Sequence, residues 1–261
     1  MGKVSSKIFN PRGEAVGKTR LPSVFKTQIR PDVIKRAVVA IQSHRIHAQG
    51  RDKYAGKRTT AESWGVGRHL SRVPRLRDRS RAAFAPGTVG GRTAHPPVSE
   101  KKIAKKIPRR ESRLALYSAI AATGLKEIIG SRGHVVDDVP DLPLVVTDEI
   151  ESLERTKDIK DALVSLGVWP DVYRVKESIK VRSGKGKMRG RKTKMGVGPL
   201  IVVSKDNVIM EAAQNIPGVD VARVEDLNVE LLAPGAHPGR LTLWSSSTIE
   251  KLRNMTEEGA E

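Results

Sequence analysis

Residues 49–108 restrict the fold of this 261-residue chain more than any other stretch, because they cannot build a hydrophobic core. Glycine, proline, serine, histidine and arginine dominate the segment, and its few apolar residues follow neither a helical nor a strand period. Such a composition buries too little apolar surface to offset the entropy lost on ordering. We therefore expect either a disordered basic linker or an extended loop that becomes ordered only on a partner.

Positive charge is the second constraint. The formal net charge is +19, and lysine and arginine are dispersed over most of the chain. Such a surface attracts polyanions through Coulomb steering and counterion release. Aromatic residues make up only 3% of the chain, so rows of rings for stacking single-stranded bases are missing. A nucleic-acid partner would be held by phosphate contacts, arginine stacking and shape.

The composition also bears on the cellular compartment in which the chain is expected to work. No run approaches the ~20 apolar residues that cross a bilayer, so no membrane partner is expected. The chain has no cysteine, which excludes disulfides and thiolate metal sites and is compatible with a reducing cytosol.

The two flanking segments, 1–48 and 109–261, have the periodicity of one α/β domain. Turns are expected before Pro31, and helical spacing follows at 31–41 and again at 114–128, closed by Gly130. Strands are then predicted at 144–146, 172–175, 200–203, 219–224 and 241–243, and helices at 158–166, 208–214 and 248–253. This alternation predicts a three-layer α/β/α domain with a mostly parallel sheet, and the extended basic loop is inserted in it.

A second basic cluster occupies residues 176–194. Its glycines let the backbone approach phosphates and its cations neutralise them, although such a cluster can also be a merely solvated loop. Two clusters on one chain favour binding of a polyanion. The side chains that we expect to contact it are Arg51, Lys53, Lys57, Arg58, Arg68, Arg72, Arg75, Arg77, Arg79, Arg81, Arg92, His95, Lys185, Lys187, Arg189, Arg191, Lys192 and Lys194.

The sequence lacks the motifs that bind nucleotides and the ligand spacing that binds metal ions. Residues 190–193 lack the spacing of a phosphate-binding P-loop, and the Gly-x-Gly pairs lead to no third glycine. His44 and His47 could share a helix face, but a metal would need further ligands that are not near in sequence. We therefore predict no metal site, no cofactor and no catalytic residue.

The carboxylates that follow the predicted strand at 144–146 are the feature of the sequence that most favours an enzyme. Asp148, Glu149 and Glu151 lie where ligand sites form in α/β sheets, and carboxylates with a basic surface could serve a Mg²⁺-dependent nuclease. The alternative is that they occupy the first turn of the next helix, where the helix dipole favours negative charge. No paired nucleophile and base supports catalysis.

Seven short motifs occur in order along nearly the whole chain. They lie at residues 54–59 (YAGKRT), 62–68 (ESWGVGR), 91–97 (GRTAHPP), 118–123 (SAIAAT), 186–191 (GKMRGR), 231–235 (LLAPG) and 238–241 (PGRL). Each has little specificity alone, but the ordered set is highly specific. By these motifs the chain resembles the universal large-subunit ribosomal protein family called L-four, in its archaeal and eukaryotic form.

The resemblance implies a globular α/β domain on the subunit surface and a long loop threaded into the large-subunit (23S-type) rRNA. In that family the loop tip lines the polypeptide exit tunnel, and the protein binds rRNA early in assembly. By position the tip is residues 68–90, which are unusually rich in arginine. The expected tip side chains are Arg68, Leu70, Arg72, Arg75, Arg77 and Arg79.

The resemblance thus implies a structural protein that is ribosome-bound in the cytoplasm and is not an enzyme. Its partners would be the rRNA, neighbouring ribosomal proteins at the tunnel and the nascent peptide, with no homo-oligomer. Mg²⁺ would be present only as ions bound to the rRNA. Two other classes stay open, namely a Mg²⁺-dependent RNA-processing enzyme and a free-standing basic chaperone or chromatin-type protein.

Overall fold

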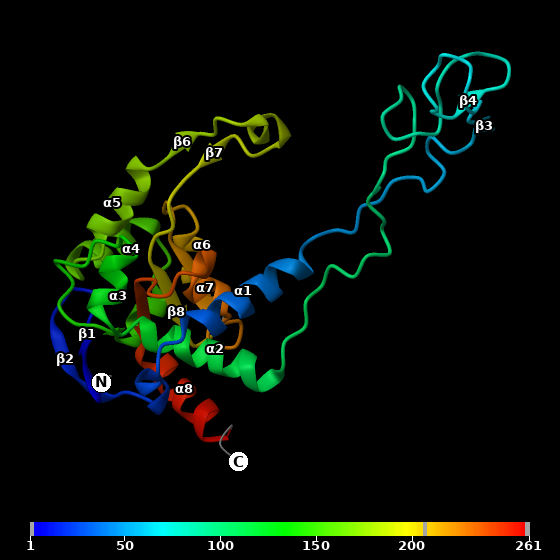
Figure 1. Cartoon of the computed structure of the whole chain (residues 1–261). Coiled ribbons are helices and arrows are strands. Elements are labelled where there is room, and N and C mark those ends of the chain that lie inside the picture. Colours follow the sequence, from blue (N-terminus) through cyan, green and yellow to red (C-terminus); the bar gives the residue numbers. More distant parts are fainter. Residues whose placement is uncertain (1–2, 206–207, 259–261) are drawn as a thin grey trace. The chain divides into compact units, whose positions relative to one another are not determined.

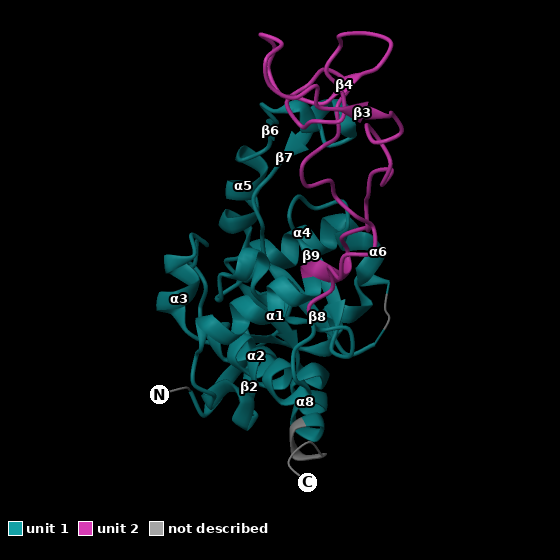
Figure 2. Ribbon diagram, turned by 45° about the vertical axis from the view of Figure 1, so that its right-hand side comes forward, with its two compact units in different colours: residues 1–41, 106–261 teal, residues 42–105 magenta. Residues whose placement is uncertain are grey.

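The computed structural model describes residues 3–205 and 208–258 (Figure 1). The chain divides into two compact units, which Figure 2 colours separately. Unit 1 comprises residues 1–41 and 106–261, and unit 2 comprises residues 42–105. We keep 49–108 as the predicted limits of the extension, because helix α1 (Pro31–His44) ends just before it and α2 (Arg109–Ala122) begins just after it.

Unit 1 is built on a six-stranded sheet in the order β2-β1-β5-β10-β8-β9. The strands are β1 (Ser5–Phe9), β2 (Ala15–Arg20), β5 (Leu144–Val146), β8 (Leu200–Val203), β9 (Asp220–Arg223) and β10 (Thr242–Ser245). Within this sheet, as far as the structure describes it, the edge pair β1 and β2 is antiparallel and the other neighbouring strands are parallel. The mostly parallel sheet predicted from the sequence is confirmed.

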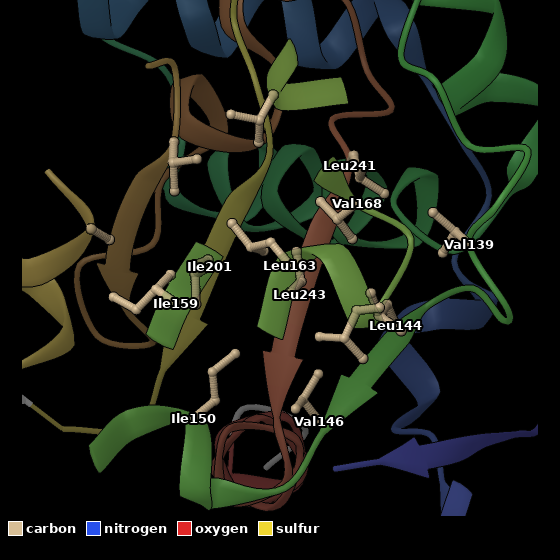
Figure 3. Close-up of a cluster of buried hydrophobic side chains, with 14 of the residues drawn as sticks. Val139, Leu144, Val146, Ile150, Ile159, Leu163, Val168, Ile201, Leu241 and Leu243 are labelled. Atoms are coloured by element: carbon tan, nitrogen blue, oxygen red, sulfur yellow. The ribbon is translucent and has the colours of Figure 1, made fainter. Parts of the chain in front are cut away.

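One face of the sheet packs against four helices. These are α3 (Lys126–Ser131), α4 (Thr156–Ser165), α5 (Trp169–Glu177) and α6 (Ile209–Ala213). Leu144, Ile201 and Leu243 point from the strands toward Ile159 and Leu163 of α4 (Figure 3). Because side chains alternate along a strand, the residues between them must supply the core on the opposite face.

The opposite face carries α1, α2, α7 (Val229–Leu232) and α8 (Ser246–Glu258), with a short 3-10 helix, η1 (Ser23–Lys26). Trp244 is paired in register with Val145 on one side and Val202 on the other, and all three are fully buried. Phe25 meets the Trp244 ring edge-on, with centroids 5.7 Å apart. Buried cores on both faces confirm the three-layer α/β/α architecture.

The turn expected near Asn10 is present: the N-terminal residues form the β1–β2 hairpin, which turns at 10–14 where the Asn10 side chain accepts hydrogen bonds from the backbone of Arg12 and Glu14. Two local predictions were wrong. Residues 172–175 are helical in α5, where Val172 and Val175 lie one helical turn apart and are both buried. The helix expected at 114–128 breaks after Ala122 and resumes as α3, which contains Gly130.

Unit 2 holds two short antiparallel strands, β3 (Ala61–Glu62) and β4 (Arg75–Leu76), and is otherwise irregular. Its outgoing and returning segments touch, since the Arg51 amide donates to the Pro97 carbonyl at 3.0 Å. None of residues 44–105, all of which the structure describes, is buried. Among the described helices, none is long and apolar enough to span a membrane.

Candidate nucleic-acid interface

The predicted contact residues of unit 2 lie at its surface. All are exposed except Arg75 and Arg92, which are half-buried. With no hydrophobic core beneath them, these side chains rest on turns and loops, so the surrounding backbone can adapt to a partner. The unit therefore presents a dense group of cations on a support that contributes little stability of its own.

The few carboxylates of unit 2 are shared among these cations. Arg58 contacts Asp52 at 2.6 Å, Arg77 contacts Glu62 at 3.4 Å, and Lys53 pairs with Glu100. All six side chains are well exposed, and exposed ion pairs contribute only about 0–1 kcal/mol each. A phosphate oxygen can therefore replace a carboxylate at little energetic cost.

Two other cations of unit 2 stack on aromatic rings. The guanidinium of Arg68 lies 5.5 Å from the Trp64 ring centroid, and that of Arg92 lies 5.7 Å from Phe84. Such stacking holds a guanidinium in place without neutralising it.

Arg75 has a different role within the predicted tip. It donates to the Ser71 hydroxyl at 2.9 Å and to the Ser80 carbonyl, so its guanidinium ties two turns together. Of the six predicted tip residues, Arg75 is half-buried, whereas Leu70 and the other arginines are exposed.

The second basic cluster, predicted at 176–194, begins in the last turn of α5 and continues into a hairpin that we call the basic arm, residues 179–196. Figure 1 shows β6 (Lys180–Val181) and β7 (Thr193–Lys194) running side by side beyond the end of α5. A 3-10 helix, η3 (Lys185–Arg189), caps the hairpin and ends at Gly190. With φ of 78°, Gly190 occupies the left-handed region, which is why glycine suits this turn.

Polar contacts give the basic arm its shape, since it lacks buried residues. Arg182 donates to the carbonyls of Arg191 at 3.1 Å and Thr193 at 3.3 Å, across the hairpin. At the base, the Gly196 amide donates to the Ser178 hydroxyl at 2.7 Å. The predicted cations Lys185, Lys187, Arg189, Arg191, Lys192 and Lys194 are all exposed.

The acidic group behind the nuclease alternative is structural. Asp148 and Glu151 belong to a 3-10 helix, η2 (Asp148–Ser152), at the carboxyl edge of the sheet. Asp148 accepts from the Ser247 amide at 2.8 Å, in the first turn of α8. The buried Glu151 accepts from the Ser204 amide at 2.8 Å and from the Ser245 hydroxyl at 2.6 Å. These carboxylates bind the protein's own donors.

Histidine does not assemble a metal site in the part of the chain that is described, where no group of three or more potential ligands occurs. The His44 ring nitrogen Nε2 lies 3.1 Å from the Lys105 carbonyl, so this histidine contacts backbone. His134 is buried against Asp171, with Nδ1 2.9 Å from the carboxylate.

A cluster of arginines in unit 1 was not foreseen from the sequence. Arg240 is 1% exposed and donates to the Gly198 carbonyl at 2.8 Å and to Asp220. Burial lowers its pKa, and Asp220 opposes that shift. Burial, together with the charges of Arg240 and Arg174, lowers the pKa of Arg132 to about 10. Arg174 and Arg240, from two other segments, thus lie close enough to disfavour the charged form of Arg132.

Two acid-base partners complete this cluster. Burial lowers the pKa of His134, outweighing its hydrogen bond with Asp171. Burial alone would raise the pKa of Asp171, but hydrogen bonds from His134 and Arg174 hold it below its ordinary value. Asp171 is therefore the ionised acceptor at the centre of this group, and no sequence motif signals it.

Comparison with known proteins gives the family. Residues 19–255 match the Ribosomal protein L4/L1 family. The large ribosomal subunit protein uL4 of Methanosphaera stadtmanae is 46% identical, over 99% of each chain. Its counterpart in Archaeoglobus fulgidus is 48% identical over 95% of this chain and 98% of its own, and that of Saccharolobus solfataricus is 46% identical over 96% and 94%. The resemblance drawn from the seven motifs is confirmed: the chain belongs to the ribosomal protein L4/L1 family, in its archaeal form.

Proposed function

We propose that this chain is a structural constituent of the large ribosomal subunit, ribosome-bound in the cytoplasm, and that it binds the large-subunit rRNA through unit 2 and the basic arm. One observation carries the proposal. Residues 44–105 bury no side chain, yet they expose a dense set of cations. Such a segment gains its order from a polyanion rather than from a core of its own.

The binding mechanism is neutralisation of phosphates. Exposed cations of unit 2 exchange their weak ion pairs for RNA phosphates, while arginines held on Trp64 and Phe84 keep their charge available. Lys185, Arg189 and the neighbouring cations do the same on the basic arm. The α/β sheet of unit 1 anchors both elements. No cofactor takes part, and Mg²⁺ enters only as ions bound to the RNA.

Residues 68–90 are proposed to form the end of the extension, beside the polypeptide exit tunnel. The exposed Arg68, Arg72 and Arg79 would meet rRNA, neighbouring ribosomal proteins or the nascent peptide, while Arg75 fixes the turns beneath them. Early binding of the extension would order both protein and RNA, which supports a role in subunit assembly. One copy suffices for this role, so no homo-oligomer is required.

Cosedimentation with large subunits tests the proposal. Wild-type chain should stay with the subunit after a wash in salt high enough to strip surface-bound basic proteins, because an extension enclosed in RNA cannot leave by simple ion exchange. A variant that lacks residues 68–90 should be released at lower salt. Complete release of the wild-type chain at moderate salt would contradict the proposal.

The two alternatives make different predictions. A free-standing basic chaperone would bind any nucleic acid equally and would not cosediment after the wash. A Mg²⁺-dependent nuclease would cleave RNA in the purified state and lose turnover in Asp148→Asn. We expect no cleavage by either protein, because Asp148 is engaged by the Ser247 amide.

A further inference from the structure

A cavity of about 480 Å³ opens on unit 1, between the end of α3, helix α5 and the loop at 234–239. Its polar lining consists of Ser131, Arg132, His134, Arg174 and His237, and no carboxylate lines it. We call it the arginine pocket. The two guanidiniums and the imidazole of His237 are donors of the kind that bind oxyanions.

The two arginines of the pocket are fixed in place. Arg132 donates to the Pro234 carbonyl at 3.0 Å and to the His237 carbonyl. Arg174 donates to Asp171 at 2.9 Å and to the Val197 carbonyl at 2.9 Å. A guanidinium has five N–H donors, so each of the two retains donors beyond these bonds. Fixed guanidiniums lose little side-chain entropy when an anion arrives.

Gly239 holds the wall of the arginine pocket close to α3. Its φ is +91°, and a Cβ at this position would lie 2.7 Å from the Ile128 Cγ2 atom and 2.9 Å from the Ile128 carbonyl oxygen. Only glycine allows both this conformation and this approach. The loop that supplies His237 is therefore set against the helix that supplies Ser131.

Charge in the arginine pocket is not balanced. Asp171 forms an ion pair with Arg174 and a hydrogen bond with His134, and Asp220 forms an ion pair with Arg240. Arg132 forms no ion pair with a carboxylate in the described part of the chain, and the charges of Arg240 and Arg174 help to lower its pKa to about 10. A positive charge is left without a counterion at a half-buried position, where an anion would be stabilised most.

We propose that the arginine pocket binds one phosphate group, supplied by the RNA backbone. The location favours RNA as the source, because Arg174 precedes the basic arm in the chain and Val197 follows it. An RNA strand that lies along the arm passes the pocket at its base. This choice of source rests on the proposed function, whereas phosphate binding itself rests on the pocket alone.

Titration of the full-length protein with inorganic phosphate tests the site. At constant ionic strength with chloride as the reference, the Nε–Hε resonances of Arg132 and Arg174 should shift and saturate. Ser131→Glu places a carboxylate at the rim of the pocket and should weaken phosphate binding about tenfold or more.

Ser152→Glu is the matched control. Ser131 and Ser152 are both exposed, both end a short helix, and both hydroxyls donate to the carbonyl three residues earlier. Phosphate should bind the Ser152→Glu protein as it binds the wild type. A wild-type protein without a saturable shift, or equal phosphate binding by Ser131→Glu and Ser152→Glu, would overturn the site.

Reconstitution into large subunits then tests the source of the phosphate. The Ser131→Glu protein should dissociate from the subunit at lower salt than the Ser152→Glu protein. Equal salt resistance of the two would overturn RNA as the source and leave free phosphate as the ligand. If neither the wild type nor the control enters the subunit, the proposed function is contradicted. The phosphate titration still shows whether the pocket binds phosphate.

Discussion

The Ser245 hydroxyl donates a hydrogen bond of 2.6 Å to the buried carboxylate of Glu151, 94 residues earlier in the chain. The same carboxylate accepts from the amide and the hydroxyl of Ser204, so the ends of β8 and β10 converge on it. This edge of a parallel sheet is where α/β proteins usually bind ligands. Here a side chain of the protein fills the position and joins two strands to η2.

Replacing Glu151 by Gln should destabilise unit 1 by about 2 kcal/mol, because an amide offers one oxygen where several donors converge. Urea-induced unfolding followed by circular dichroism measures the loss. Glu149→Gln changes the same charge on the same short helix at an exposed position and should cost under about 0.5 kcal/mol. Equal effects of the two substitutions would show that charge, not the hydrogen bonds, matters.

Replacing Arg240 by Lys should cost about 3 kcal/mol, since one ammonium cannot reach the carbonyls and the carboxylate that the buried guanidinium serves together. Asp220→Asn removes only the charged partner, whose side chain is 53% exposed, and should cost about 1 kcal/mol or less. Thermal unfolding of both variants checks the order. A larger loss for Asp220→Asn would locate the stabilisation in the ion pair instead.

Lowering the pH from 7.5 to 5.5 should reduce the free energy of unfolding through His134. Burial lowers the pKa of His134 in the folded state, so the unfolded chain binds this proton first as the pH falls through about 6.5. The pKa of Asp171 is also lowered, and its contribution is lost only in more acidic solution, below about 4. Urea titrations at both pH values should show a smaller loss for His134→Gln than for wild type. His95→Gln, at an exposed position, should behave as wild type.

Removing three cations of the basic arm should lower the salt dependence of RNA binding. For the triple variant with Ala at Lys187, Arg189 and Arg191, the slope of log K against log salt should fall by about 2 to 3. The matched control replaces Lys18, Lys26 and Lys157, which are exposed elsewhere on unit 1, and removes the same net charge. Filter-binding isotherms at several salt concentrations give both slopes, and identical slopes would argue against phosphate contacts by the arm.

Deleting residues 68–90 and joining the ends with a short Gly-Ser linker should leave unit 1 folded. That segment lacks buried residues, whereas the two cores of unit 1 come from residues outside it. The contribution of the buried Trp244 to the near-ultraviolet circular dichroism spectrum should be retained with an unchanged melting midpoint. Loss of that signal would show that the extension supports the sheet domain.

Local periodicity was sufficient to predict β5, β8, β10 and α4, because each buries a continuous apolar run or one helical face. It failed for β2, an exposed edge strand with little apolar alternation, and for α5, whose valines suit a strand equally well. The arginine pocket could not be predicted, since Arg132, Arg174 and His237 come from distant segments. Only the tertiary fold brings them together.

The absence of any buried side chain between residues 44 and 105 also bears on the lifetime of the free protein. Trypsin-like proteases cut after lysine and arginine in accessible, poorly supported backbone, and this stretch offers such sites in abundance. If RNA encloses the extension as proposed, the same sites would be out of reach. Molecules made in excess of their partner would therefore be degraded first, so the extension itself would match the amount of protein to the amount of RNA.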